Sequence, residues 1–360
     1  MALHIKFESV ASLFSEGCED NDPHDAPPTI AGLGARRAAV LHETLPQRLA
    51  RLVQVAAHAL HPSCLASIAP ACDLLWRERI IGATGLPDPD QALARPDGLA
   101  GLAPDLGAAT LISAYQRGLH ARCLMGPATF WAPAQRLVAH PANLAVTKKL
   151  RGQFHKREYD VTLDHDFDAL LAACAGRSAH LPRLNPKIMQ AHAGLFDAGA
   201  AHGFEVWDRK GQLVGGGYGV AIGRVFVLER MFGLVPQAAQ LGLAVFARHL
   251  AAWDFRMLDG SFVVGLVADM GFAGLSRAAY NQLLDGNARA GKPGRWRAQP
   301  EIYTARTRST AARRLFDEPV PAARGDVQAV AASKARLFDA LGLENQPSGP
   351  QPTHAKNLAA

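Results

Sequence analysis

The sequence lacks the short motifs that by themselves identify several classes of enzyme. Its 360 residues contain no Gly-x-Ser-x-Gly nucleophile elbow, no His-Glu-x-x-His zinc motif and no phosphate-binding P-loop. No stretch approaches the roughly 20 consecutive apolar residues that a membrane-spanning helix requires. We therefore expect a protein with no membrane contact, whose function must be sought in a wider pattern of residues.

Cysteine is also scarce. There are 5 cysteines, an odd number, with neither Cys-x-x-Cys pairs nor the spacing of zinc ligands. This pattern is typical of reduced thiols in a cytosolic protein, and the first residues do not resemble a signal peptide, so we expect a cytoplasmic location. His192, His202 and His249 form no compact ligand set, so we expect no metal ion, and we expect no cofactor.

The excess of positive charge is confined to one end of the chain. The 38 Lys and Arg exceed the 32 Asp and Glu, which gives a net charge of +6. Residues 289–360 hold 12 basic and 6 acidic side chains and account for the whole excess. Because 49% of the residues are hydrophobic and only 19% are charged, the chain as a whole is not predicted to be disordered.

Shifts in composition divide the chain into four predicted parts. Residues 1–84 are predicted to be a partly disordered N-terminal extension, and residues 85–146 a small N-terminal α/β domain. Residues 147–288 alternate strands and helices and form the predicted main domain. Residues 289–360 are predicted to be a basic C-terminal tail.

The hydrophobic pattern predicts the elements of the core. Helices are predicted at 108–117, 167–175, 185–197 and 237–253, and strands at 159–163, 204–207, 212–220, 224–228 and 255–259. Hairpins bracketed by helices, followed by a strand–helix–strand crossover, indicate an α+β fold around one mixed sheet.

The segment 224–253 resembles the core of the GNAT acyltransferases, which implies a GNAT-like mixed sheet flanked by helices. The GNAT loop that holds CoA has the pattern Arg/Gln-x-x-Gly-x-Gly/Ala, and here only Gly242 and Ala244 match it. The glycine-rich segment 215–219 lies inside a strand, which favours close backbone packing over phosphate binding. Because of the resemblance to the GNAT fold, an acyl-CoA-dependent N-acyltransferase stays open as an alternative function, although the CoA loop is matched only in part.

A longer series of motifs extends from about residue 85 to residue 285. It includes Pro-Asp-Gly-Leu at 96–99, Ser-Ala-Tyr-Gln-Arg-Gly at 113–118, Phe-Trp-Ala-Pro at 130–133, Phe-Glu-Val-Trp-Asp at 204–208, Glu-Arg-Met-Phe at 229–232 and Phe-Arg-Met-Leu-Asp at 255–259. In this order and spacing the motifs resemble the leucyl/phenylalanyl-tRNA–protein transferase family. The resemblance implies transfer of Leu, Phe or Met from aminoacyl-tRNA to the N-terminal α-amino group of an acceptor protein beginning with Arg or Lys. In that family the transfer marks the acceptor for degradation by the N-end rule.

The resemblance also implies roles for individual residues. Asp259 corresponds to an aspartate that orients the attacking amine, Glu229 to a glutamate that supports the site, and Ser261 to a glutamine of the family. The implied substrate-binding residues are Phe226, Met231 and Phe246 in an apolar pocket, Trp131 against the 3′-terminal adenosine, and His192 at the position of a family tyrosine.

A cluster of basic residues coincides with the region of the family that meets the tRNA acceptor stem. Its members are Lys148, Lys149, Arg151, Lys156 and Arg157. Lysine and arginine are the side chains that contact phosphates, so aminoacyl-tRNA is an expected partner. The second expected partner is the acceptor protein. The chain itself is expected to be a monomer.

Some family positions carry different residues here. The family sequence Asp-Cys-Gln is Asp259-Gly260-Ser261, Gly-Glu-Ser-Met is Leu228-Glu229-Arg230-Met231, and Phe-Pro-Trp is His120-Ala121-Arg122. Three interpretations of these replacements stay open: an altered donor, an altered acceptor, or a non-catalytic RNA- or degron-binding protein on the same scaffold.

Overall fold

The computed structural model describes residues 30–59, 62–82, 85–123, 127–147, 150, 152, 159–176, 184–287, 294–299 and 302. The chain divides into two units between Val40 and Leu41. Helix α2 (Ile30–Val40) is the described part of the first unit, and all the other described elements belong to the second.

The second unit starts with two helices and a small sheet. Helices α3 (Leu45–Ala59) and α4 (Pro62–Ile81) are followed by the strands β1 (Leu99–Leu102), β2 (His120–Arg122) and β3 (Thr129–Trp131). The three strands pair in the order β1-β3-β2, all antiparallel. Helix α5 (Ala108–Gln116) lies between β1 and β2 in the chain, and the carboxylate of Glu78 on α4 accepts a hydrogen bond from the backbone of Leu102.

A seven-stranded mixed sheet forms the centre of the unit. Its strand order is β10-β4-β9-β8-β7-β6-β5. The strands are β4 (Gln135–Ala139), β5 (Tyr159–Leu163), β6 (Ala201–Asp208), β7 (Leu213–Ile222), β8 (Val225–Gly233), β9 (Met257–Asp259) and β10 (Ala273–Ser276). Strands β8 and β9 pair in parallel, and the other neighbours pair antiparallel.

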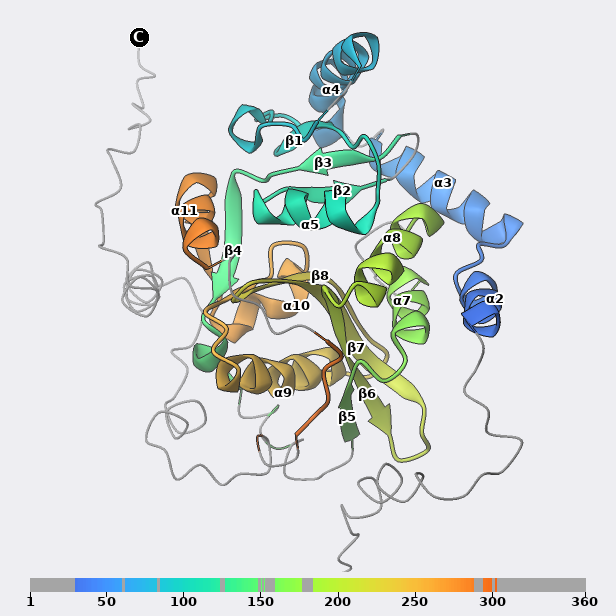
Figure 1. Ribbon diagram of the computed structural model, residues 1–360, viewed down its shortest axis with the longest axis vertical. Coiled ribbons are helices and arrows are strands. Elements are labelled where there is room, and N and C mark those ends of the chain that lie inside the picture. Colours follow the sequence, from blue (N-terminus) through green and yellow to red (C-terminus); the bar gives the residue numbers. More distant parts are fainter. Residues whose placement is uncertain are drawn as a thin grey trace, which may run out of the picture. The chain divides into compact units, whose positions relative to one another are not determined.

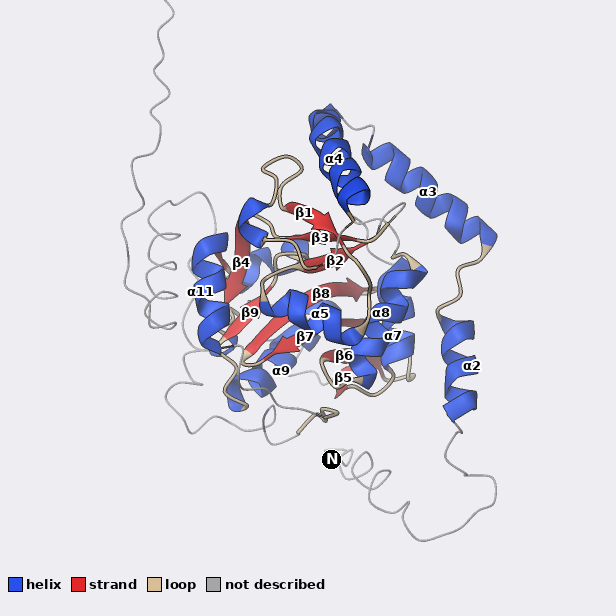
Figure 2. Ribbon diagram, turned by 45° about the horizontal axis from the view of Figure 1, so that its top comes forward, coloured by secondary structure: helices blue, strands red, loops and turns tan. Residues whose placement is uncertain are grey.

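Helices cover both faces of this sheet (Figure 1). Helix α9 (Ala238–Ala252) makes the crossover from β8 to β9 and packs on one face. Helices α5, α7 (Phe167–Gly176) and α8 (Pro186–Asp197) pack on the other, where Figure 2 shows them beside one another. Helices α10 (Val264–Val267) and α11 (Arg277–Asn287) follow β9 and β10.

Close packing against α9 explains two glycines of the sequence. A Cβ atom at Gly215 would lie 2.7 Å from the Cβ of Ala238, and one at Gly242 would lie 2.6 Å from side-chain carbons of Phe204 and Val206. Carbon atoms do not approach this closely, so both positions need the bare backbone of glycine. The expectation of close backbone packing in the glycine-rich strand is thereby confirmed at Gly215.

Local hydrogen bonds account for several element boundaries. Asn185 caps α8 by accepting the backbone N–H of Lys187 at 2.9 Å, and proline occupies the next position, where its missing N–H costs nothing. The hairpin between β6 and β7 closes around Asp208, whose Oδ1 accepts the N–H groups of Lys210 and Gln212 at 2.9 Å. Gly211 then takes a φ of +72°, which glycine adopts without strain.

The α+β prediction is confirmed, and each core helix and strand predicted between residues 108 and 259 is present within a few residues of its predicted bounds. The short strands β1, β2, β4 and β10 were not predicted. With three to five residues each, they are too short to show an alternating pattern, and their pairing depends on distant partners. Strand β4 lies in the stretch predicted to be the small domain, yet it pairs within the large sheet.

Part of the stretch predicted to be a basic tail packs into the core. Trp296 is 2% exposed, its ring stacks on His202 with centroids 3.6 Å apart, and it also meets Phe246 and Phe255. The backbone N–H of Gln299 donates to Nε2 of His249 at 2.8 Å. The folded core therefore includes residues around 296, while most of the predicted tail lies outside the described residues.

No helix in the described part of the chain has both the length and the apolar character needed to span a bilayer.

Candidate active site

Strand β8 carries an irregularity at the centre of the candidate site. Arg230 pairs with Tyr218 and Leu228 with Gly219, so Glu229 is the extra residue of a β-bulge. A bulge breaks the alternation of a strand and turns neighbouring side chains to one face. Glu229 and Arg230 accordingly both lie on the face covered by α5, α7 and α8, where Glu229 meets Tyr115 and Arg230 lies near Tyr218.

Glu229 is held by two hydrogen bonds to the same oxygen. The hydroxyl of Tyr115 donates to Oε1 at 2.6 Å, and Nδ1 of His120 lies 3.2 Å from it. Burial alone acts to raise the pKa of Glu229, but the hydrogen bonds from Nδ1 of His120 and from the Tyr115 hydroxyl outweigh burial and lower it to about 2. Glu229 is therefore a carboxylate at neutral pH, and burial together with this charge raises the pKa of Tyr115 well above its usual value.

His120 links Glu229 to a buried arginine. Its Nε2 is in contact with a terminal nitrogen of Arg136, which can only donate. Nε2 must therefore accept, so Nδ1 carries the proton and donates it to Glu229. Burial and the charge of Arg136 lower the pKa of His120 to about 4, which agrees with a neutral ring in this tautomer.

Arg136 in turn contacts the second carboxylate. One terminal nitrogen lies 3.4 Å from Oδ2 of Asp259, and the other donates to the carbonyl of Gly118. The guanidinium also lies over the ring of Tyr280, 4.5 Å from its centre. Both members of the Arg136–Asp259 pair have fully buried side chains, so the pair depends on these contacts for compensation of its lost hydration.

Ser261 completes the surroundings of Asp259. Its backbone N–H donates to Oδ1 at 2.9 Å, its hydroxyl donates to the same oxygen, and its Oγ accepts the N–H of Leu137 at 2.9 Å. The serine thus fixes the carboxylate and ties β9 to β4.

His192 contacts Tyr115 on the side of Glu229 that is away from Arg136 and Asp259. Its Nδ1 donates to the carbonyl of Ile188 at 2.9 Å, and its Nε2 lies 3.3 Å from the Tyr115 hydroxyl. The residue is 2% exposed, and burial lowers its pKa. The contacts therefore run without interruption from His192 through Tyr115, Glu229, His120 and Arg136 to Asp259 and Ser261. We name this chain of contacts the buried polar network.

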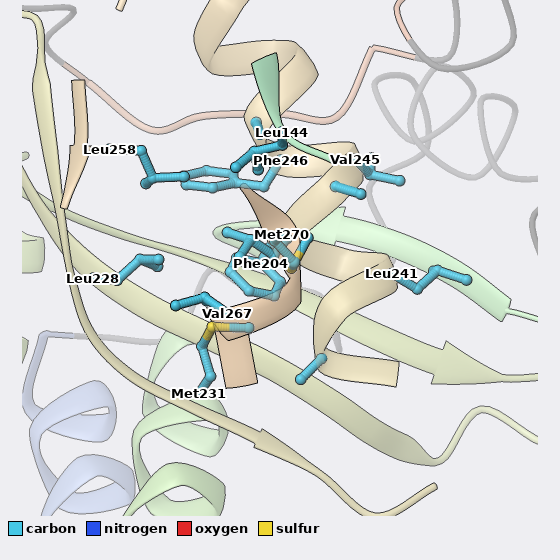
Figure 3. Packing of buried hydrophobic residues seen from close by; sticks show 14 of the residues in the cluster. Leu144, Phe204, Leu228, Met231, Leu241, Val245, Phe246, Leu258, Val267 and Met270 are labelled. Carbon is cyan, nitrogen blue, oxygen red and sulfur yellow. The ribbon is translucent and has the colours of Figure 1, made fainter. Parts of the chain in front are cut away.

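The predicted pocket residues lie elsewhere. Phe226, Met231 and Phe246 are 0–2% exposed and belong to the hydrophobic cluster between α9 and the sheet, where Figure 3 shows Met231 and Phe246. They lie on the face of the sheet opposite the buried polar network. The structure thus brings together Asp259, Glu229, Ser261 and His192 but places the three apolar residues in the core.

Trp131 lies at the edge of the network. It is partly exposed, its indole N–H donates to the hydroxyl of Thr129 at 2.8 Å, and the guanidinium of Arg122 lies 5.7 Å from its ring centre. The same guanidinium lies 4.3 Å from the ring centre of Phe262, and Phe262 packs edge-on against His120.

The predicted tRNA-binding cluster, Lys148, Lys149, Arg151, Lys156 and Arg157, lies outside the described residues. Within the described residues, no group of three or more His, Cys, Asp or Glu side chains is arranged to hold a metal ion.

Three residues of the network were not identified from the sequence. Tyr115 and His120 lie in and just after the Ser-Ala-Tyr-Gln-Arg-Gly motif, and Arg136 follows the Phe-Trp-Ala-Pro motif. The signal available was a change of residue type, because His120 is a titratable residue where the family motif has an aromatic one. The sequence gave no signal for Arg136, since an arginine in a strand of five residues is usually expected at the surface.

Comparisons with known proteins agree with the motif pattern. Residues 138–285 match the family model described as leucyl/phenylalanyl-tRNA protein transferase. A protein of that name from Cellvibrio japonicus is 35% identical over 201 residues, which cover 55% of this chain and 85% of the relative. One from Pseudomonas fluorescens is 33% identical over 226 residues, covering 62% and 99%, and one from Chromohalobacter salexigens is 37% identical over 202 residues, covering 55% and 78%.

Proposed function

Because this chain belongs to the leucyl/phenylalanyl-tRNA–protein transferase family, we propose that it transfers an apolar amino acid, Leu, Phe or Met, from aminoacyl-tRNA to the N-terminal α-amino group of an acceptor protein. Among this chain's own residues, the buried polar network is the observation that supports the proposal. It joins Glu229 and Asp259, which lie 30 positions apart on different strands, through Arg136 and His120.

The reaction needs a neutral amine beside the ester. The nitrogen of the acceptor attacks the carbonyl carbon of the aminoacyl ester, the new C–N bond forms, and the bond from that carbon to the ribose oxygen breaks. One proton leaves the amine and one is taken up by the ribose oxygen, so the tRNA departs with a free hydroxyl. A side chain that orients the amine and accepts a hydrogen bond from it accelerates this step.

Glu229 is the carboxylate that a substrate can reach. Its side chain is 11% exposed, whereas that of Asp259 is fully buried with both oxygens already contacted by Ser261 and Arg136. In this proposal Glu229 contacts the amine. Asp259 is a positioning residue that acts through Arg136 and His120.

The alternative of an acyl-CoA-dependent enzyme is less well supported. Gly242, one of the two residues that match the CoA-loop pattern, lies inside α9, and its lack of a side chain is required by Phe204 and Val206. Packing therefore accounts for this glycine without a phosphate ligand.

The direct test is an assay of transfer. The full-length protein is incubated with radiolabelled leucyl- or phenylalanyl-tRNA and peptides that differ in their first residue and include Arg, Lys, Glu and Gln. We expect label in at least one peptide, alongside a transferase of the same family as positive control. If no peptide is labelled, the proposed function is wrong, and turnover of acetyl-CoA in a parallel assay would support the alternative.

Two variants separate the roles of the carboxylates. Glu229→Gln should lower kcat/KM by about 100-fold or more, since it removes the group that contacts the amine. Asp259→Asn should lower it less, by roughly tenfold, and should shift the pH dependence of kcat because the variant changes the charge facing Arg136 and His120. An Asp259→Asn enzyme with the wild-type pH profile would contradict the positioning role.

A further inference from the structure

The transfer reaction takes a proton from the amine, and three groups of the buried polar network are poor acceptors for it. Glu229 is a weak base, because its hydrogen bonds lower its pKa to about 2. Burial and the charge of Arg136 lower the pKa of His120 to about 4, and both ring nitrogens of His120 are engaged, one with Glu229 and one with Arg136. Asp259 is fully buried, and its two oxygens contact Ser261 and Arg136. A base that works near neutral pH must be sought elsewhere in the network.

His192 differs from these groups because one of its ring nitrogens keeps a lone pair. Its Nδ1 lies 2.9 Å from the carbonyl oxygen of Ile188, which can only accept, so Nδ1 carries the proton of the neutral ring. Nε2 is therefore unprotonated, and it lies 3.3 Å from the hydroxyl of Tyr115. That hydroxyl has a single proton, which it donates to Oε1 of Glu229 at 2.6 Å. Two acceptors thus compete for one proton, and Tyr115 can turn it to either.

The surroundings keep the ring of His192 neutral at pH 7. Burial lowers its pKa below the ordinary value of 6.5, while the charges of Glu229 and Arg230 act on it in opposite directions. The ionisable groups that contact it or act on it electrostatically are Tyr115 from α5, Tyr218 from β7, and Glu229 and Arg230 from β8. Helix α7 and strand β6 also pack against α8, and their buried ionisable residues are Cys174, His202 and Glu205. The last two are held by hydrogen bonds of their own.

An amine bound at Glu229 is within reach of this base through Tyr115. Oε1 of Glu229 and the hydroxyl oxygen of Tyr115 are 2.6 Å apart, so a nitrogen at hydrogen-bond distance from the first can lie at the same distance from the second. The amine carries more than one N–H group and can therefore donate to both oxygens. When Tyr115 turns its own proton to Nε2 of His192, its oxygen is ready to accept a proton from the amine.

We propose that His192 is the final acceptor of the amine proton, in a relay that runs through Tyr115. This inference rests on the proposed function and adds a proton path to the same site. As the nitrogen bonds to the carbonyl carbon, one of its protons passes to the oxygen of Tyr115, and the proton of Tyr115 passes to Nε2 of His192. When the bond from that carbon to the ribose oxygen breaks, the proton returns from His192 through Tyr115 to the ribose oxygen.

One relay can serve both steps, because the nitrogen and the ribose oxygen are bonded to the same carbon. The side chains end in the protonation states in which they began. In this scheme Tyr115 touches the substrate, and His192 is a positioning residue that acts through it. The family resemblance implies a tyrosine at position 192, so the relay is particular to chains that carry histidine there.

The test measures single-turnover transfer to the peptide that is labelled fastest in the assay above, at saturating peptide and between about pH 5 and pH 8. With the wild-type protein we expect the rate to fall with decreasing pH through the lowered pKa of His192, because a protonated Nε2 cannot accept. The amine of the peptide, with a pKa of about 8, adds a separate decline at higher pH. His192→Gln can accept a hydrogen bond but cannot take up the proton. It should lower the rate about 100-fold or more with little change in KM, and should lack the decline that belongs to His192.

His249→Gln is the matched control. His249 is also buried on a helix, and its Nδ1 also lies 2.9 Å from the carbonyl oxygen four residues earlier, but its Nε2 accepts the backbone N–H of Gln299. The rate and pH profile of this variant should equal those of the wild type, and thermal unfolding checks that each variant is folded. Tyr115→Phe combined with His192→Gln should be no slower than Tyr115→Phe alone, because one loss already interrupts the relay. Losses that multiply would contradict a shared path.

Nitrogen NMR of the wild-type protein with labelled histidines supplies a readout that does not depend on activity. Near neutral pH we expect His192 to carry its proton on Nδ1 and a lone pair on Nε2, and a proton on Nε2 overturns the inference. If His192→Gln is folded and transfers at the wild-type rate with the wild-type pH profile, the inference is wrong and the proposed function stands. If the wild-type protein labels no peptide, the proposed function fails and the relay fails with it.

Discussion

At the scale of single residues, the site is governed by which groups are charged. Glu229 stays ionised because hydrogen bonds from His120 and Tyr115 outweigh burial. His120 stays neutral because burial, and then the charge of Arg136 at its second nitrogen, lower its pKa. Each group's state depends on its neighbour. A substitution at any one of these positions therefore changes the charge state available to the others.

His120 should make stability depend on pH in a defined direction. Its pKa is about 4 in the folded protein and about 6.5 in an unfolded chain. Between these values the unfolded chain binds a proton that the folded protein does not, so the free energy of unfolding falls as the pH is lowered from about 6.5 to about 4. The lowered pKa of Glu229 acts in the same direction at more acidic pH.

The substitution His120→Asn tests this. The loss of stability between pH 7 and pH 4 should be smaller in the variant by roughly 1–3 kcal/mol, whatever its stability at pH 7. Urea unfolding at several pH values measures it. His42→Asn, at an exposed position, controls for removal of a surface histidine, and identical pH slopes for His120→Asn and wild type would show that His120 is not buried as a neutral ring.

At the scale of elements, the position of α9 against the sheet fixes where the site can be. Its packing needs Gly215 and Gly242, and it fills one face with apolar side chains. The polar residues of the candidate site lie on the other face, where Tyr115 of α5 and His120 of the small sheet contact Glu229 of β8.

Gly242→Ala should destabilise the protein by roughly 1–2 kcal/mol. Alanine favours a helix by up to about 1 kcal/mol over glycine, but the new methyl group would lie 2.6 Å from Phe204 and Val206, and overpacking typically costs 1–3 kcal/mol. Gly194→Ala in α8 is the matched control, because a Cβ there meets nothing within 4 Å. It should be neutral or stabilising in thermal unfolding. Equal stability of the two variants would contradict the packing argument.

The elements and the site differ in how far the sequence predicts them. Helix α8 was predicted to begin at Asn185-Pro186 because a proline in the first turn of a helix is a local signal. The bulge at Glu229 was not predicted, because it depends on how β7 pairs with β8, and a single strand's sequence does not show that pairing. For the same reason the sequence pointed to Glu229, Asp259 and Ser261 through motifs but gave no sign that Arg136 joins them.

At the scale of the whole molecule, the segment around Trp296 belongs to the core that supports α9. The ring packs against Trp253 and Phe246 of the α9 region and stacks on His202 of β6. Asp164 ties this contact together, since its Oδ2 lies 2.8 Å from both the backbone nitrogen of Trp296 and Nδ1 of His202.

Trp296→Ala should therefore cost about 3–5 kcal/mol, the usual range for deleting a buried aromatic side chain. The neighbouring Arg297→Ala, at an exposed position, should change stability by less than about 0.5 kcal/mol. Urea unfolding of both variants measures the difference. A Trp296→Ala protein as stable as Arg297→Ala would place this segment outside the cooperative unit.

The buried polar network has a practical consequence for truncation. Tyr115, His120 and Arg136 precede residue 138, where the match to the family model starts, while Glu229 and Asp259 lie within the match. A gene fragment cut to the matching segment would encode both carboxylates and none of the three residues that contact them. The shortest expressible enzyme must therefore begin upstream of Tyr115, and its N-terminal boundary is set by electrostatics as much as by folding.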